Sequence, residues 1–262
     1  MIEKIGADRK EQYEIKGLFV ARSRYFSWLL SSSILLLLIF RPQVAMAANS
    51  TTYLYRDQTG NEQVFFCWTL QQQKDQVVIT SRKLDEIYRN MCGLRGSTRR
   101  WEVRKPGVQA KAWVEERQLI LKGEIDGHAV SWTKDLQGRT WHQPLSYTLR
   151  EVALGRTPEI TFCCIRPDTL ELVGLRAQRM GEEKVQVAGS QMSAVKVRIR
   201  LQGLLRMVWH ADYWFRTKDG VFIRYQGVNG PPGTPKTTIE LMNECLPWKE
   251  CVHSLGCQSD SK

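Results

Sequence analysis

The chain has 262 residues, of which 42% are hydrophobic and 25% charged, and it carries a formal net charge of +11. It contains no internal repeat and no low-complexity linker, which argues against a repeat protein or a string of small domains. The basic excess would suit anionic lipid headgroups or other acidic polymers of a cell envelope, although a solvated basic surface is the simpler explanation.

The first 47 residues are predicted to be a signal peptide. A polar, basic stretch precedes the apolar run 26–40, which at about 15 residues is shorter than the roughly 20 that a membrane-spanning helix needs. Small residues at 45–47 then fit a signal peptidase, so cleavage is predicted after Ala47. An uncleaved N-terminal anchor is the alternative. Cleavage would leave one periplasmic or secreted domain, 48–262, with no expected nucleic-acid partner.

All seven cysteines lie in the predicted mature chain and are disulfide candidates in an oxidising compartment. They are Cys67, Cys92, Cys163, Cys164, Cys245, Cys251 and Cys257. Because seven is odd, at least one must stay free, be capped or pair between chains, and spacing does not give the connectivity. The adjacent pair at 163–164 is expected to face opposite sides of a strand, with one member bonded elsewhere.

The last three cysteines lie in a cysteine-rich tail, 243–262, which is predicted to be tethered at least in part by disulfides. A zinc site that includes His253 is the alternative. The tail lacks the short C-x2-4-C pairs typical of structural zinc sites, so no metal is predicted.

Alternating apolar and polar residues predict a mainly β protein. Between 181 and 227 the alternation repeats through consecutive antiparallel strands, with Val195, Val197 and Ile199 on one face. The pair Asp126-Gly127 is the strongest hairpin signal in the chain. Further strands are predicted over 51–55, 63–70, 76–80, 109–115, 117–125, 128–134, 160–165, 171–179 and 237–242.

One or two short helices are expected among these strands. Apolar residues in 84–91 recur at i, i+3, i+4 and i+7, which predicts an amphipathic helix. A second helix is predicted to begin at Pro144 and to end at Gly155. The basic run 98–107, which contains Trp101, is interpreted as a solvated loop or as a segment that lies at a lipid interface.

These elements predict a curved antiparallel sheet, an open half-barrel, whose concave face could hold large aromatic side chains in a groove. The candidate ligand-binding residues are Trp209, Tyr213, Phe215, Phe222 and Tyr225. Alternation places Trp214 on the opposite face. A β-sandwich, in which the same residues would be ordinary core, is the rival architecture.

The sequence carries no catalytic signature. It lacks the nucleophile elbow, the phosphate-binding loop, the dinucleotide glycine motif and the zinc-protease motif. An aspartate at 212 could orient a histidine at 210, but no nucleophile is tied to the pair. The protein is therefore predicted not to be an enzyme, with no catalytic residue and no cofactor.

A loose pattern resembles an uncharacterised family of proteobacterial periplasmic domains. It consists of Gly181-Glu182-Glu183, Val187-Ala188-Gly189, Ala194-Val195-Lys196-Val197, Tyr213-Trp214-Phe215 and Gly220-Val221-Phe222-Ile223-Arg224-Tyr225. That family is similar in turn to the lipoprotein-carrier (LolA/LolB-like) half-barrels, which fold a long antiparallel sheet around a helical plug and bind acyl chains. The resemblance implies a similar fold but carries over no binding residue.

The sequence thus favours an exported binding or carrier module for an apolar or amphipathic envelope molecule, such as a lipid or a lipoprotein. The alternative is a structural or interaction protein that docks a partner of the envelope through a sheet edge or a basic face.

Overall fold

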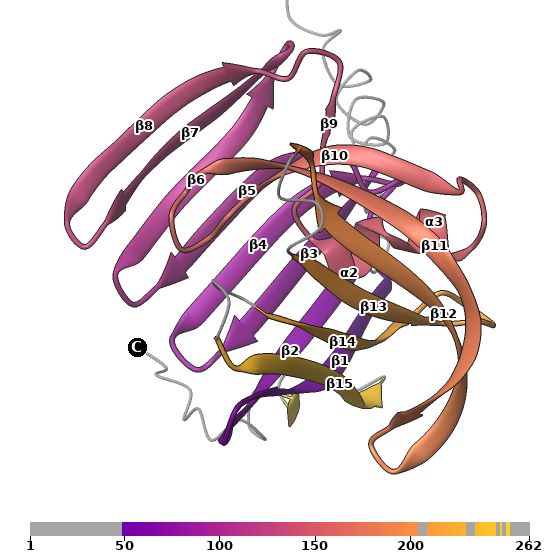
Figure 1. Ribbon diagram of the computed structural model, residues 1–262. Coiled ribbons are helices and arrows are strands. Elements are labelled where there is room, and N and C mark those ends of the chain that lie inside the picture. The colour runs from indigo at the N-terminus through magenta and orange to yellow at the C-terminus, as the bar shows by residue number, and fades with distance from the viewer. Residues whose placement is uncertain (1–48, 204–208, 229–233, 245–246, 248–249, 252–262) are drawn as a thin grey trace, which may run out of the picture. The chain divides into compact units, whose positions relative to one another are not determined.

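The computed structural model describes residues 49–203, 209–228, 234–244, 247, 250 and 251 (Figure 1). The predicted signal peptide and its cleavage site lie outside these residues, as do Cys245, His253 and Cys257. Within the described part, no helix combines the length and the hydrophobicity that crossing a membrane requires.

The described residues form one 15-stranded sheet, which confirms the prediction of a mainly β, open and mostly antiparallel sheet. The strands are β1 Asn49–Thr59, β2 Glu62–Gln72, β3 Gln76–Lys83, β4 Glu86–Gly93, β5 Thr98–Lys105, β6 Val108–Glu115, β7 Gln118–Ile125, β8 His128–Asp135, β9 Thr140–Trp141, β10 Glu159–Ile165, β11 Leu172–Val187, β12 Ser190–Leu201, β13 His210–Arg216, β14 Phe222–Val228 and β15 Lys236–Glu244. Every pairing is antiparallel except that of β9 with β10.

The sheet consists of two consecutive meanders joined through one strand pair. Strands β1 to β8 pair in chain order, strands β9 to β15 do the same, and β1 pairs with β15. The junction places Tyr55 opposite Leu241 and continues to Thr59 opposite Thr237. The two edges of the sheet are therefore β8 and the short β9. At the Asp126-Gly127 turn, β7 and β8 form the hairpin that the sequence predicts.

The second predicted helix is present as two single turns, α2 (Leu145–Thr148) and α3 (Arg150–Ala153). Pro144 precedes α2, and Gly155 follows α3 with a φ of +72°. Leu149 and Val152 are fully buried in a core that α3 shares with β11 and β12. The helices thus plug part of the inner side of the sheet (Figure 1).

Two hydrophobic cores lie on either side of β10. Phe162 and Cys164 point into the first core, which contains the helices and the aromatic residues of β13 and β14. Cys163 and Ile165 point into the second core, together with Trp101 of β5 and residues of β6 and β7. Since β9 also contacts β5, the β5–β8 end of the sheet overlaps the β9–β10 end. Both faces of β10 are therefore covered.

The prediction of a helix over 84–91 is wrong. This segment consists of the turn after β3 and most of β4. Leu84 lies at the turn with a φ of +46° and is 52% exposed. Ile87 pairs with Arg82 and Met91 with Val78, so neighbouring strands satisfy the backbone. Apolar residues on both faces of one strand produced the helical spacing by coincidence, and sheet pairing decided the outcome.

The interpretation of 98–107 as a loop or a lipid-contacting segment is also wrong. Residues 98–105 form β5, whose Trp101 is only 1% exposed and whose Val103 is buried beside it in the second core. The arginines at 100 and 104 occupy the opposite, exposed face. The basic residues and the tryptophan are thus the two faces of one amphipathic strand.

One disulfide joins Cys67 of β2 to Cys251, with a Cα to Cα distance of 6.0 Å. It confirms that the tail is tethered to the sheet, and a disulfide of this kind indicates an extracytoplasmic protein. The other disulfide candidates in the described part of the chain, Cys92, Cys163 and Cys164, are free. The 163–164 pair does face opposite sides of its strand, as expected, but neither member is bonded elsewhere. Burial raises the pKa of Cys92 and of Cys164 to about 12, so both stay as thiols.

Candidate functional site

The structure brings the five groove candidates together at the first core. Phe215, Phe222 and Tyr225 are buried in this core, and Trp209 and Tyr213 are partly buried and pack against it. The Tyr213 ring lies 5.0 Å from that of Tyr225 and 5.8 Å from that of Phe222, measured between centroids. Phe215 is fully buried, and the indole N–H of Trp209 donates to the Val228 carbonyl at 2.7 Å. These close contacts between the rings favour the filled-core alternative over an open groove.

A β-bulge explains how Phe222 and Tyr225, three positions apart, come to share a face. Phe222 pairs with Phe215, and Tyr225 pairs with Tyr213, with a register shift between the two pairs. Ile223 is the extra residue in β14. Simple alternation would have placed Phe222 and Tyr225 on opposite faces.

Trp214 and Asp212 lie on the other face of β13, where charged side chains surround them. The Lys196 ammonium lies 5.0 Å from the Trp214 ring centroid. Both carboxylate oxygens of Asp212 accept hydrogen bonds from Arg198, at 2.7 and 2.8 Å. Burial alone would raise the pKa of Asp212, but the Arg198 hydrogen bonds and the Lys196 charge outweigh it and lower the pKa. Asp212 therefore serves an ion-pair network and does not orient His210.

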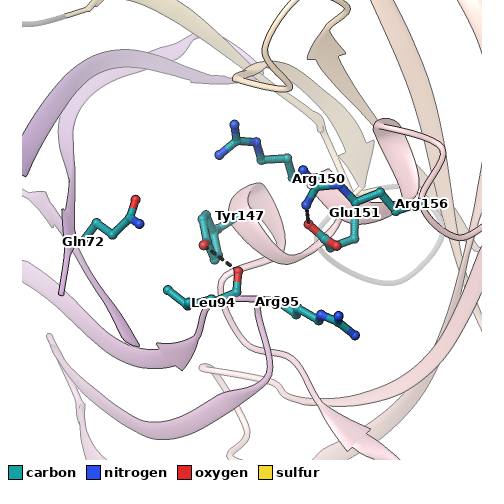
Figure 2. A pocket seen from close by; sticks show the side chains of 7 residues that line it. All are labelled: Gln72, Leu94, Arg95, Tyr147, Arg150, Glu151 and Arg156. Carbon is teal, nitrogen blue, oxygen red and sulfur yellow. Dashed lines mark hydrogen bonds and ion pairs between the residues drawn. The ribbon is translucent and has the colours of Figure 1, made fainter. Parts of the chain in front are cut away.

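A pocket of about 260 Å³ lies where the ends of β2 and β4 meet the two helices (Figure 2). Its lining residues are Gln72, Leu94, Arg95, Tyr147, Arg150, Glu151 and Arg156. We call it the arginine pocket, because three of its seven residues are arginines and only one is acidic. This excess of positive charge is the feature that a functional site could use.

Two carbonyls of the turn that presents Arg95 accept hydrogen bonds, one from α2 and one from the segment before α2. The Tyr147 hydroxyl donates to the Leu94 carbonyl at 3.0 Å, as Figure 2 shows. Nδ1 of His142 donates to the Gly96 carbonyl at 2.9 Å. Gly96 has a φ of +88°, and a Cβ there would lie 2.9 Å from the Thr148 Cα, so the turn packs directly on α2. These contacts fix the two walls of the pocket against each other.

The three arginines have different partners. The Arg150 Nη2 donates to the Asp219 carbonyl at 2.7 Å, while its buried Nε has no hydrogen-bond partner among the described residues. Arg156 pairs with Glu151 at 2.6 Å (Figure 2). Arg95 is exposed and forms no ion pair within the described part of the chain. The pocket thus offers one uncommitted cation and two that are partly engaged.

The remaining groups of the pocket stay neutral or paired. Burial raises the pKa of Tyr147, so its phenol remains protonated and serves as a donor. Among the described residues, no group of three or more His, Cys, Asp or Glu side chains could hold a metal ion. Arginine guanidinium groups bind carboxylates and phosphates with paired hydrogen bonds. The chemistry of the pocket therefore fits an anionic group.

His142 leads to a prediction about pH. Burial lowers its pKa, which outweighs the opposing effect of the hydrogen bond to Gly96. As the pH falls, the unfolded chain, in which the pKa of histidine is about 6.5, takes up this proton before the folded protein does. The contribution of neutral His142 to the free energy of unfolding is therefore largest above pH 7, and it decreases as the pH falls below about 6.5. Urea denaturation between pH 5 and pH 7 measures this slope.

The matched variants for that slope are His142→Gln and His128→Gln, since His128 is exposed. The first should flatten the slope and the second should leave it unchanged. An identical slope in all three proteins would show that another group causes the pH dependence.

Sequence reasoning did not identify the arginine pocket. Its residues come from a strand end, a turn and the two helical pieces, and no motif spacing connects them. The available signal was weak: Arg150 and Arg156 bracket the predicted helix end, and Arg95 lies between the two wrongly predicted segments, 84–91 and 98–107. Only the sheet register brings Gln72 and Arg95 to the same rim.

No protein-family model and no curated protein sequence matches the chain. Among solved structures, it is similar to a beta-barrel-like protein of domain of unknown function DUF1849 from Brucella abortus. That match has a TM-score of 0.54 and 8% identity, and it covers 76% of this chain and 98% of the other.

Two further structures are less similar. The hypothetical lipoprotein YmcC from Escherichia coli matches with a TM-score of 0.33 and 11% identity, over 81% of this chain and 96% of the other. A DUF1329 family protein from Desulfovibrio piger matches with a TM-score of 0.25 and 10% identity, over 78% and 88%. Neither score supports an argument. The comparisons therefore show that this chain shares the fold of the DUF1849 protein, and they assign it no activity.

Proposed function

We propose that the protein is a periplasmic binding module for an anionic, amphipathic molecule of the cell envelope, and that the arginine pocket receives the anionic group. The observation that carries the proposal is the presence of Arg95, Arg150 and Arg156 around one pocket with Glu151 as the only carboxylate. A phospholipid with a net negative headgroup has the required chemistry.

The positions of the cations support this assignment. Arg95 is free to bind a ligand, and the walls that carry Arg95 and Arg150 are held together by Tyr147 and His142. A preformed site loses less conformational entropy on binding than one that must be ordered. Residues 48–262 contain 31 Lys and Arg against 23 Asp and Glu, and this formal charge of +8 would attract an anionic ligand at long range.

The proposal differs from a carrier of the lipoprotein-carrier type in where the ligand lies. The inner side of the sheet holds α2, α3 and the first core, in which or against which the five aromatic residues expected to line a groove are packed. The ligand is therefore placed at the strand ends, outside that core. The Cys67–Cys251 disulfide supports a location outside the cytoplasm.

Replacing Arg95 or Arg156 with glutamine should weaken binding of short-chain phosphatidylglycerol by about 10- to 100-fold each. A hydrogen bond to a charged group contributes about 1.5 to 3 kcal/mol, and about 1.4 kcal/mol corresponds to a factor of ten. Isothermal titration calorimetry with the dihexanoyl lipid measures the affinity. The corresponding phosphatidylcholine, which has no net charge, should bind weakly to all variants.

Arg166→Gln is the matched control, because Arg166 is exposed, lies outside the arginine pocket and pairs with Asp168 on a surface loop. It removes the same charge and should leave the affinity unchanged. Equal losses in Arg166→Gln and Arg95→Gln would indicate a diffuse effect of net charge, and the proposed site would be wrong.

A further inference from the structure

A second, larger pocket of about 470 Å³ lies against the segment that connects α3 to β10. It is lined by Gly155, Pro158, Glu159, Gln178, Arg179, Met180 and Gly181. The two pockets share this segment, because Arg156 lines the arginine pocket and its neighbour Gly155 lines the second one. We call the second one the Met180 pocket.

The exposed side chain of Met180 distinguishes this pocket. Only three large hydrophobic residues of the described part are exposed: Leu84 (52%), Leu94 (46%) and Met180 (46%). Leu84 is at a turn, whereas Leu94 lines the arginine pocket and Met180 lines its neighbour. Each pocket therefore presents one apolar side chain that the fold leaves uncovered. A flexible methionine side chain adapts readily to apolar ligands.

The exposure of Met180 follows from a β-bulge in β11. Arg179 pairs with Val197 and Gly181 pairs with Lys196, so Met180 is the residue without a partner in the ladder. Gly181 has a φ of +133°, a conformation that other residues rarely adopt. Bulges of this kind re-aim side chains and are frequent beside functional sites.

The charged residues around Met180 are already neutralised. Arg176 Nε donates to a Glu159 carboxylate oxygen at 3.2 Å, and Arg179 pairs with Glu182 at 2.8 Å. The Arg179 backbone N–H donates to the Pro158 carbonyl at 3.2 Å, which holds β11 against the connecting segment. Each of these arginines is therefore neutralised by a glutamate. The surface that remains for a ligand is the apolar surface of Met180 and Pro158.

We infer that the Met180 pocket binds the alkyl chain of the molecule whose anionic group occupies the arginine pocket. The inference rests on the proposed function and adds the apolar half of the ligand. Arg156 and Gly155 are adjacent in the sequence, so the two pockets are neighbours along this segment, and an alkyl chain that starts beside Arg156 would cross the segment to reach Met180. The arginine pocket would then bind the anionic headgroup, and the Met180 pocket would bind the alkyl chain.

The test measures affinity for methyl, hexyl and dodecyl phosphate by isothermal titration calorimetry, with each below its micelle concentration. These probes share a headgroup and differ only in the chain. Hexyl phosphate should bind at least about tenfold more tightly than methyl phosphate, because each buried methylene adds to the affinity. In Met180→Ser this gain should be largely lost, while methyl phosphate should bind as it does to the unchanged protein.

Leu84→Ser is the matched control, since it removes an equally exposed apolar side chain outside both pockets. It should retain the full dependence on chain length, and circular dichroism should show that both variants are folded. An affinity that does not depend on chain length, or an equal effect of the two serine variants, would overturn the inference.

The outcomes also separate this inference from the proposed function. Binding of methyl phosphate that depends on Arg95 but shows no gain with longer chains leaves the arginine pocket standing and removes the apolar one. Binding of dodecyl phosphate that depends on Met180 but not on Arg95 does the reverse. Absence of binding for all three probes would contradict both.

Discussion

Phe215→Ala is expected to lower the free energy of unfolding by about 3 to 5 kcal/mol, which is the usual cost of truncating a buried phenylalanine. Phe215 is fully buried, and the centroid of its ring lies 5.9 Å from that of Phe222. The Phe222 centroid lies in turn 5.4 Å from that of Tyr55. Removing the ring leaves a cavity at the centre of the first core. Urea denaturation followed by tryptophan fluorescence measures the loss.

Phe65→Ala is the control, because Phe65 lies on β2 and is only partly buried. It should cost clearly less than Phe215→Ala. The groove interpretation predicts the opposite pattern, in which Phe215→Ala and Tyr213→Ala leave stability nearly unchanged and abolish binding of a fluorescent lipid probe. That result would restore the aromatic residues as a binding site.

Removing the Cys67–Cys251 disulfide is expected to lower the melting temperature by roughly 5 to 15 °C. The two cysteines are 184 residues apart in the sequence, and the loss of a native bridge typically costs about 2 to 5 kcal/mol. For a domain of about 200 residues, 1 kcal/mol corresponds to roughly 2 to 4 °C. Calorimetry of the double variant Cys67→Ser/Cys251→Ser measures the change.

Reductant provides the internal control for this prediction. It should lower the melting temperature of the unchanged protein to about that of the double variant, and it should leave the double variant unaffected. A double variant as stable as the unchanged protein would show that the bridge contributes nothing to the folded state.

The sheet was largely predictable because period-two alternation is a local property of the chain. The residues Val195, Val197 and Ile199 are buried as expected, and the Asp126-Gly127 hairpin forms as expected. The failures have a physical cause as well. The segment 84–91 has apolar residues on both faces of its strand, whereas 98–107 has charged residues on one face and apolar residues on the other. In both segments, pairing with the neighbouring strands determines the conformation.

The candidate site was much harder to predict than the sheet. The arginine pocket depends on which strand ends meet, which is a property of register and of the placement of α2 and α3. The five aromatic residues were correctly placed together, but their sequence does not reveal whether another element covers them. The helices and β1, through Tyr55, provide that cover.

We expect the junction between β1 and β15 to form late in folding. Within each meander nearly every strand pairs with its predecessor, and such local contacts form quickly, whereas the β1–β15 pair joins the two ends of the described chain. During synthesis and export β1 to β8 emerge first. The edge of β1 that pairs with β15 therefore stays unpaired until β15 has emerged. An unpaired edge of this kind is prone to aggregation. The Cys67–Cys251 bridge joins β2 to the segment after β15, so it holds the two ends of the described chain together once β1 and β15 have paired.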